Sequence, residues 1–423
     1  MVSGDDERSS KRRFAPPTVE EQKTLRGVDF TSGGSASAAL NKGPSAEARG
    51  VFRSNLLALE VKELLDEARA TPLSAGTVKS KKVKAALFRL HGALRGMPSA
   101  KIMASSAKAV APCLKLWSED PEKTALAFEP PQKIDIVGSY MLGSMVKAEK
   151  CIDVALTIPK RCIHAKDYLN YRFANKRALY LEAVANFIAT DKTIANDFKC
   201  VEISAPSRDV LRASIVCKFS KKSGAGGYSV RITACAPEGA FPHRRFAPGV
   251  NNVRRRDTIA RRVRGEVDEG DERPQPATPH YNASVLAESA GPSSTKAHLE
   301  HLHAVSKQCP SFADACTLVK VWMRQRRMAG KEAPSDSFNS FHTCMLLSHL
   351  VAEKQISRQS SALQLFTRLV QYLAKHDMRA SRGFHVAMRK PDNEQGKFFL
   401  IFVRFEMLSS SGRADAKNAR ACD

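Results

Sequence analysis

The sequence predicts an α+β protein in which a mixed sheet flanked by helices is followed by a helical second domain. Two apolar runs, at 134–137 and 152–158, have the length of buried strands, and the first ends in Gly138-Ser139. Apolar residues between 311 and 373 recur instead with the period of a helix. With 423 residues, of which 43% are hydrophobic, the chain is long enough for two or three domains.

The chain carries a large excess of positive charge. Lys and Arg number 67 against 43 Asp and Glu, which gives a formal net charge of +24. Such a charge favours a polyanionic partner, either nucleic acid or an anionic membrane. Because no stretch approaches roughly 18 uninterrupted apolar residues and no basic amphipathic helix stands apart from a core, we expect no membrane contact. Nucleic acid is the favoured partner.

The residues that commonly hold metals show no convergent pattern. The ten cysteines are scattered without a C-x-x-C pair, which indicates a reducing, intracellular compartment and offers no zinc site. His298, His301 and His303 raise a metal hypothesis, but helical spacing aligns only the first two. We therefore interpret these histidines as surface or packing residues and expect no metal and no cofactor.

The first 100 residues divide into a tail and two helices. Residues 1–50 are rich in Ser, Gly, Ala and charged residues, so we expect a disordered tail. Within it, Lys11-Arg12-Arg13 is either part of a nuclear address or a solvated charge run. Residues 51–100 contain helical spacing over 56–68 and again over 83–94, and we expect these helices to pack as a hairpin.

Residues 101–240 are expected to form the first domain, around the mixed sheet. Glycine lets the backbone turn sharply after the first strand, and Ser139 can cap a short helix whose free N–H groups would hold a phosphate. Asp153 would then lie on the neighbouring strand, beside the glycine turn. This arrangement suits a nucleotide. The stretch 107–128 fits a strand or a short helix equally well and stays unassigned.

A helix and two or three further strands complete this domain. The strands are expected at 200–204, 211–219 and 228–236. The helix, from about Asp167 onward, has an apolar face and a basic face, and the basic face is either solvated or an RNA contact. The apolar face consists of Leu169, Phe173, Tyr180, Val184 and Phe187, and the basic face of Arg172, Lys176 and Arg177.

Residues 241–279 are expected to form a charged linker. Eight arginines come first and five acidic residues follow, so the segment is either a self-neutralising, solvated insertion or an RNA contact that orders on binding. Arginine forks bind phosphate in a bidentate manner, which supports the RNA contact. The arginines are Arg244, Arg245, Arg254, Arg255, Arg256, Arg261, Arg262 and Arg264.

Residues 280–408 are expected to form the helical second domain, and 409–423 a disordered tail. Ser311 can cap a helix whose apolar face includes Trp322, which we interpret as a core residue rather than a base-stacking platform. Further helices are expected at 341–351 and 362–373. The segments 383–389 and 397–405 alternate like the strands of a hairpin.

The motif at 134–158 resembles the nucleotidyltransferase superfamily of poly(A) polymerases, whose pattern is an apolar residue, Gly-[Gly/Ser], a spacer and Asp-apolar-[Asp/Glu]-apolar. In active members these two carboxylates and a third from a later strand hold two divalent metals. Here the second strand reads Asp153-Val154-Ala155-Leu156, so that Ala155 replaces a carboxylate. The later strand at 228–236 contains no Asp or Glu. One of three expected ligands remains.

More narrowly, the strings VGSYMLG, DVALTIPK and KDYLNYRFANKRALYLEAVA resemble the Nrap family of nucleolar RNA-associated proteins, components of the small-subunit processome. The similarity continues in NNVR, TPHYNASVL and CPSFADACTLVKVWMRQR, and covers roughly residues 56–400. It implies a degenerate nucleotidyltransferase-like first domain and a poly(A)-polymerase-like second domain. It also implies location in the nucleus and nucleolus, and partners among pre-ribosomal RNA, small nucleolar RNA and processome proteins. Family members continue further, so we expect this chain to be the N-terminal portion.

We therefore expect a non-catalytic RNA-associated assembly factor in small-subunit pre-ribosomal RNA processing. One alternative is an active nucleotidyltransferase in which Asp209 or Asp135 completes the site. Another is a protein-interaction scaffold whose Gly-Ser turn is only architectural. The remnant motif consists of Gly138, Ser139, Asp153 and Ala155, and the candidate RNA contacts are Arg172, Lys176, Arg177, Arg244, Arg245, Arg254, Arg255 and Arg256.

Overall fold

A computed structural model of the chain describes residues 46–70, 76–107, 125–204, 210–247, 249–253, 277–289, 294–329, 338–376, 384–388 and 399–403. The chain divides into two units, residues 1–57 and 58–423. The predicted tail at 409–423, most of the tail at 1–50 with its Lys11-Arg12-Arg13 cluster, and Asp209 lie outside the described residues. So do Arg254, Arg255, Arg256, Arg261, Arg262 and Arg264.

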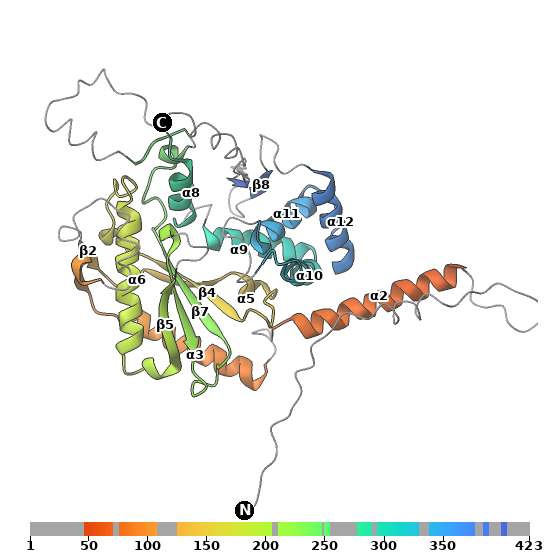
Figure 1. Cartoon of the computed structure of the whole chain (residues 1–423), viewed down its shortest axis with the longest axis horizontal. Coiled ribbons are helices and arrows are strands. Elements are labelled where there is room, and N and C mark those ends of the chain that lie inside the picture. The colour runs from red at the N-terminus through yellow and green to blue at the C-terminus, as the bar shows by residue number, and fades with distance from the viewer. Residues whose placement is uncertain are drawn as a thin grey trace, which may run out of the picture. The chain divides into compact units, whose positions relative to one another are not determined.

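A five-stranded mixed sheet forms the centre of the first domain (Figure 1). Its strands lie in the order β3-β4-β7-β6-β5, with β4 and β7 parallel and the other neighbours antiparallel. All five strands predicted for this domain are confirmed, as is the mixed character of the sheet. The strands are β3 (Lys133–Val137), β4 (Cys151–Thr157), β5 (Phe198–Ser204), β6 (Ser214–Phe219) and β7 (Ser229–Cys235).

A separate two-stranded sheet accounts for part of the stretch that the sequence left unassigned. It pairs β1 (Ala100–Met103) with β2 (Ala125–Phe128) in antiparallel register. The ring of Phe128 lies 4.7 Å from that of Tyr180, centroid to centroid. This contact packs the two-stranded sheet against the helix that follows β4. The strand interpretation of 107–128 is therefore right for its last four residues.

The two faces of β4 pack differently, and this positions the remnant motif. Side chains alternate across a strand, so Ile152, Val154 and Leu156 enter the core of the first domain, where none is more than 3% exposed. Asp153 and Ala155 point to the opposite face. Because β4 and β7 are parallel and in register, side chains of β7 alternate between the same two faces of the sheet.

Helix α6 (Arg172–Thr190) covers the face of the sheet that carries Ile152, Val154 and Leu156 (Figure 1). It begins five residues later than predicted, because Asp167 instead closes the turn before it. The carboxylate of Asp167 accepts hydrogen bonds from the backbone N–H of His164 and from Nζ of Lys176, both at 2.7 Å. Of the predicted apolar face, Phe173, Tyr180 and Val184 are fully buried. Phe187 is partly buried, and Leu169, also partly buried, precedes the helix. Two more helices, α3 (Val78–Arg95) and α8 (Pro279–Ala287), add buried side chains to the same core.

Helix α2 (Ala46–Ala68) and helix α3 contribute to two different cores. Leu65 of α2 is buried among the helices of the second domain, whereas Val83, Leu90 and Leu94 of α3 are buried under the sheet of the first. The two predicted helices are therefore present. Their buried side chains do not form a core of their own.

The first part of the predicted linker is packed onto the first domain. The rings of Phe241 and Phe246 lie 6.1 and 5.7 Å from that of Tyr168, centroid to centroid. The buried amide of Asn252 donates to Oδ1 of Asn282 at 2.7 Å and so joins this segment to α8. Residues 241–247 and 249–253 thus pack onto the first domain, and the aromatic rings of Phe241 and Phe246 supply apolar area that its core buries.

The second domain is helical, as predicted. Its helices are α9 (Thr295–Gln308), α10 (Phe312–Gln325), α11 (Ser340–Ala352) and α12 (Ala362–Lys375), and they bury a core of their own. Trp322 packs against this core, with its ring 5.9 Å from that of Phe366, in agreement with its interpretation as a core residue. Ser311 is the N-cap residue of α10, as predicted, but its side chain makes no capping hydrogen bond. Strands β8 (Phe384–Met388) and β9 (Phe399–Val403) confirm the predicted hairpin.

Arg177 corrects the expectation that it lies on an exposed helix face. Its side chain is 2% exposed, and its Nε donates to the carbonyl oxygen of Ala234 at 2.6 Å. One terminal nitrogen donates to the carbonyl oxygen of Leu211 at 3.2 Å, and the other lies 3.0 Å from Oε2 of Glu288. A guanidinium tolerates burial when its donors face acceptors in this way. Arg177 therefore joins α6 to β7 and to the end of α8.

We predict that this buried pair matters far more to stability than its exposed neighbour. Arg177→Ala leaves Glu288 without its buried partner and should lower the free energy of unfolding by about 3–5 kcal/mol. Arg212 also pairs with Glu288 at 3.3 Å but is 52% exposed, so Arg212→Ala should cost less than about 1 kcal/mol. Urea unfolding of the two variants measures the difference. Equal losses of unfolding free energy in the two variants would contradict the structural role of the buried Arg177–Glu288 pair.

Candidate functional site

The glycine turn lies against Asp153, as the sequence predicts. Val137 at the end of β3 is paired with Asp153 on β4, and Gly138 follows with a φ of +75°. A Cβ atom at this position would come within 2.6 Å of Oδ2 of Asp153. Both the positive φ and the close approach require glycine here. The Gly-Asp half of the remnant motif is thus preserved in three dimensions.

The helix that should present N–H groups to a phosphate is a single turn, α5 (Ser139–Leu142). Gly138 is its N-cap residue, and the cap makes no side-chain hydrogen bond, so the prediction that Ser139 caps this helix is wrong. Four residues align too few peptide dipoles for a strong anion site. Tyr140 and Leu142 instead anchor the turn by burial.

An arginine stands opposite Asp153 on the neighbouring strand. Arg231 on β7 is in register with Asp153, and its Nη1 lies 3.3 Å from Oδ1 of that carboxylate. Arg231 also lies 4.0 Å from Glu149, whose second oxygen is 3.6 Å from Arg324 of α10. The sequence showed that 228–236 lacks a carboxylate, but only the strand register shows which residue faces Asp153. A guanidinium rather than a carboxylate therefore faces Asp153 on the strand from which the family resemblance leads us to expect a third metal ligand.

Asp153 is half-buried, and burial and neighbouring charges act on the pKa of its carboxyl in opposite directions. Burial raises the pKa of its carboxyl above the ordinary value, whereas the positive charges of Arg231 and Lys320 act against this shift. Lys320 reaches the turn from α10, where its Nζ donates to the carbonyl oxygen of Ser144 at 3.0 Å. Two cations from the protein itself therefore surround this carboxylate.

Ala155 leaves the second ligand position without oxygen donors. Together with Val137 and Leu142, it packs against the apolar core of the second domain. Hydrocarbon contact of this kind cannot replace a carboxylate at a metal ion. The same face of the strand that would carry the second ligand is used for packing between the two domains.

Asp135 does not complete a metal site. It faces Ala155 across the β3–β4 pair, and its Oδ1 lies 3.1 Å from Nζ of Lys296 on α9. In the part of the chain that the structure describes, no group of three or more His, Cys, Asp and Glu side chains is placed to hold a metal ion. Two magnesium ions need several converging oxygen ligands, and the residues present do not fit that requirement.

The histidines of α9 serve packing. The ring of His298 lies 5.2 Å from that of Phe341, and burial lowers the pKa of His298 to about 4. Nε2 of His301 is 3.1 Å from the hydroxyl oxygen of Ser348. Both side chains are thus committed to contacts between α9 and α11, in line with the packing interpretation.

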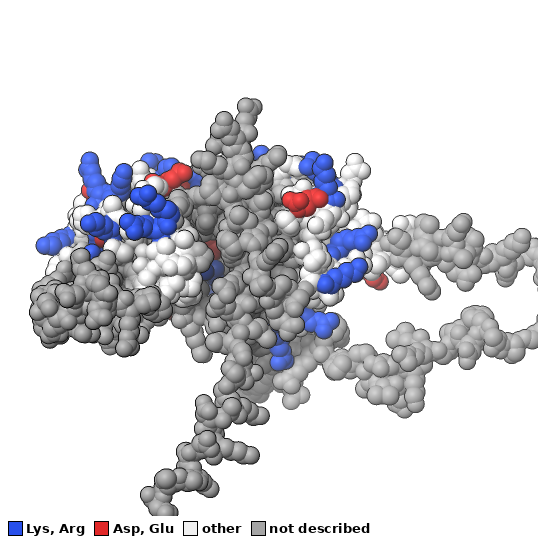
Figure 2. Space-filling view, turned by 90° about the horizontal axis from the view of Figure 1, so that it is seen from above, with Lys and Arg blue, Asp and Glu red and all other residues white. Residues whose placement is uncertain are grey.

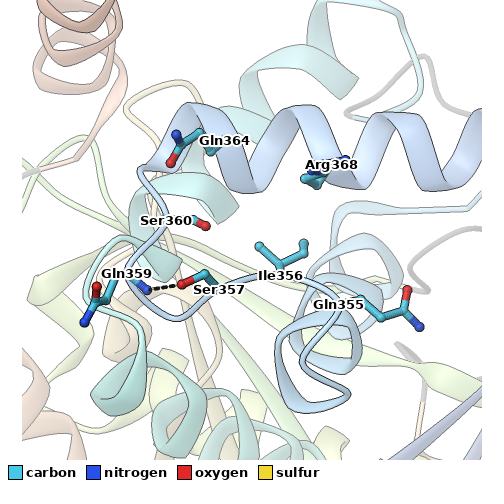
Figure 3. Close-up of a pocket in the computed structure, with 7 residues that line it drawn as sticks. All are labelled: Gln355, Ile356, Ser357, Gln359, Ser360, Gln364 and Arg368. Atoms are coloured by element: carbon cyan, nitrogen blue, oxygen red, sulfur yellow. Dashed lines mark hydrogen bonds between the residues drawn. The ribbon is translucent and has the colours of Figure 1, made fainter.

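An open cavity of about 400 Å³ lies between the end of α11 and α12 (Figure 3). Its lining side chains are mostly uncharged and polar, and they come from one loop and one helix of the second domain. None belongs to the remnant motif. They are Gln355, Ile356, Ser357, Gln359, Ser360, Gln364 and Arg368.

A basic surface lies at the start of α6, and Figure 2 shows Lys and Arg side chains gathered on that side of the molecule. We call it the α6 surface; it consists of the exposed side chains of Lys160, Arg161, Lys166, Arg172, Arg244 and Arg245. The contact between Tyr168 and Phe246 brings the segment with Arg244 and Arg245 to the segment that precedes α6. Arg161 is 87% exposed, with only Glu129 4.0 Å away.

The structure sorts the predicted RNA contacts. It brings Arg172, Arg244 and Arg245 to one surface, although they are far apart in sequence. It pairs Lys176 with Asp167 and buries Arg177. Lys160, Arg161 and Lys166 join the same surface without having been predicted, and their signal in the sequence was their place in the polar connection between a buried strand and an amphipathic helix.

Helices long and apolar enough to cross a membrane are absent from the described residues.

Two family models match the chain. One, described as Nrap protein domain 1, matches residues 97–308, and the other, described as Nrap protein PAP/OAS-like domain, matches residues 311–404. The first match extends through α8 and α9, past the boundary at 240 that the sequence suggests.

Curated relatives share about 30% of their residues with this chain. Nucleolar protein 6 of Homo sapiens is 31% identical over 332 residues, and that of Xenopus tropicalis 30% identical over 338 residues, each alignment covering 78% of this chain. Nucleolar protein 6 of Drosophila simulans is 28% identical over 401 residues and covers 92%. The chain spans only 27–28% of the length of these relatives.

Solved structures also resemble the chain. The polymerase core of TRAMP, an RNA surveillance complex, has a TM-score of 0.40 and 11% identity, over 83% of this chain and 72% of the other. The CdnC protein of E. coli MS115-1 with ATP has a TM-score of 0.40 and 15% identity, over 79% and 75%.

We predict that Asp153→Asn raises thermal stability at neutral pH. Since the carboxyl pKa is raised in the folded protein, the folded state binds this proton more tightly than the unfolded state, and ionisation destabilises it as pH rises. Asparagine mimics the protonated form, so the gain in Tm should be present at pH 7.5 and vanish below about pH 4.

Asp191 provides a control of opposite sign. Hydrogen bonds from Thr193 lower its pKa, so its charge stabilises the folded state above the ordinary pKa of aspartate. Asp191→Asn should therefore lower Tm at pH 7.5. A loss of Tm in Asp153→Asn at that pH would contradict the account of the site.

Proposed function

This chain belongs to the Nrap family, and we propose that it is a non-catalytic, RNA-associated assembly factor that acts in the nucleolus on the small ribosomal subunit. The observation that carries the proposal is the pairing of Asp153 with Arg231, where an active nucleotidyltransferase would bind metal. The name of the curated relatives, Nucleolar protein 6, supports a place in the nucleolus and hence in the nucleus.

The charge arrangement argues against nucleotidyl transfer. Metal ions stabilise the charge that develops on the transferred phosphoryl group, and losing them costs several kcal/mol of transition-state stabilisation. At about 1.4 kcal/mol per decade, such a loss is several powers of ten in rate. The guanidinium of Arg231 would also repel a divalent cation from the remaining carboxylate. An active enzyme with Asp135 as the extra ligand is disfavoured because Lys296 already holds that side chain.

The surface charge supports contact with RNA. The net charge of +24 favours a polyanion, and the α6 surface concentrates six exposed cations over a small part of the first domain. We propose that pre-ribosomal RNA or small nucleolar RNA binds there, alongside other proteins of the small-subunit processome. Arginine forks are suited to phosphate oxygens, and this contact would position RNA without reading its sequence.

The proposal is tested by salt-dependent binding of labelled single-stranded RNA to the full chain. We expect log K to fall linearly with log salt, with a slope of about −0.7 for each neutralised phosphate. Substituting Lys166, Arg172 and Arg244 by Gln should reduce the magnitude of this slope by about 2, because three contacts are lost.

A matched control substitutes Lys192, Lys307 and Lys375, which are exposed and lie outside the α6 surface, by Gln. The control should change the net charge equally and leave most of the slope in place. Absent or salt-insensitive binding by the unaltered chain would contradict direct RNA contact and favour a scaffold that binds proteins only.

A further inference from the structure

A group of lysines separate from the α6 surface surrounds Tyr228, which lies just before the first residue of β7. Tyr228 precedes this strand, whereas Ala234, near its other end, contacts Arg177 of α6. The two positions are six residues apart along the strand, a distance of about 20 Å. These lysines are therefore distinct from the α6 surface.

Three chain segments bring the lysines together. Nζ of Lys79, in the first turn of α3, lies 5.6 Å from the centroid of the Tyr228 ring, and Nζ of Lys150, just before β4, lies 5.7 Å from it. The stem of Lys82 crosses the turn between β6 and β7, where a Cβ on Gly224 would come within 2.5 Å of it.

The turn itself adds Lys221 and Lys222, both exposed. We call the group the Tyr228 cluster: Lys79, Lys82, Lys150, Lys221 and Lys222. Tyr228 is only 4% exposed, so its ring is a fixed element on which two ammonium groups rest. Both ammonium groups thus lie within cation–π distance of one buried ring.

No acidic side chain among the described residues forms an ion pair with these five lysines. Glu149 precedes Lys150 in sequence, yet its carboxylate lies 4.0 Å from Arg231 and 3.6 Å from Arg324. Arg89 of α3 and Lys218 of β6, by contrast, are paired: Arg89 with Asp197 at 2.8 Å, and Lys218 with Glu202 at 3.9 Å. Uncompensated charge is thus concentrated around Tyr228.

The placement on α3 is itself unfavourable without an anion. The helix starts at Val78, carries no acidic residue in its first turn, and has lysines at 79, 81 and 82. Cations at this end of a helix oppose its dipole and destabilise it. An anion bound in front of these lysines would remove that cost and screen their mutual repulsion.

We propose that the Tyr228 cluster is a second phosphate-backbone contact for RNA. This inference rests on the proposed function and extends it, because it assigns a separate surface to the same polyanion. Lysine ammonium groups act as point charges on phosphate oxygens and carry no base specificity. The cluster should therefore bind RNA irrespective of sequence, and its contribution should be strongly salt-dependent.

The test compares two triple variants of the full chain in RNA binding across a salt series. One replaces Lys79, Lys150 and Lys222 by Gln, and the control replaces Lys192, Lys307 and Lys375 by Gln. We expect the first variant to reduce the magnitude of the log–log slope by about 2 for single-stranded RNA, equally for two unrelated sequences. Combining it with the α6-surface variant should add the two reductions.

A second variant separates binding from folding. Lys221→Gln with Lys222→Gln alters only exposed turn side chains, leaves Tyr228 packed, and should reduce the slope by about 1.4. The inference fails if both cluster variants keep the full slope while the α6-surface variant lowers it, and the proposed function then stands. It also fails if the cluster variants lose binding to anionic vesicles or an acidic peptide but not to RNA. If the unaltered chain binds no RNA, both proposals fail.

Discussion

The contact between Asp153 and Arg231 is the constraint on which the rest of this site depends. The parallel register of β4 and β7 places the two side chains on one face, at 3.3 Å. A half-buried carboxylate needs a positive partner, because leaving it unpaired in such a place is costly. In an enzyme of this architecture metal ions would serve that need. Here Arg231 of the neighbouring strand supplies the positive charge.

The same face of the sheet has become a contact between domains. Ala155 packs against the second domain's core, and around it ion pairs join the two parts: Asp135 with Lys296, and Glu149 with Arg324. Each of these pairs is partly exposed and contributes at most about 1 kcal/mol. Their joint effect is specificity, because they place cations of α9 and α10 opposite the acids that remain near the turn. This packing supports the proposal that the remnant motif has a structural rather than a catalytic role.

Local patterns were enough to predict the sheet, the helical second domain and the position of Asp153 beside Gly138. What they could not supply was register between distant strands. The sequence showed that the strand containing Arg231 has no carboxylate. That Arg231 pairs with Asp153 depends on how β7 aligns with β4. Burial of Arg177 escaped prediction for the same reason: its acceptors, Ala234 and Glu288, are more than 50 residues away. The lysines around Tyr228 come from three segments that no sequence period connects.

The central claim, that this site no longer transfers nucleotides, is tested most directly by incorporation of labelled nucleoside triphosphates into an RNA primer. The full chain is assayed with magnesium or manganese beside Asp153→Ala. The account predicts no incorporation above that of the variant, because Arg231 and Ala155 occupy ligand positions. Incorporation that the substitution abolishes would contradict it, since a functioning metal site would then have to form around Asp153.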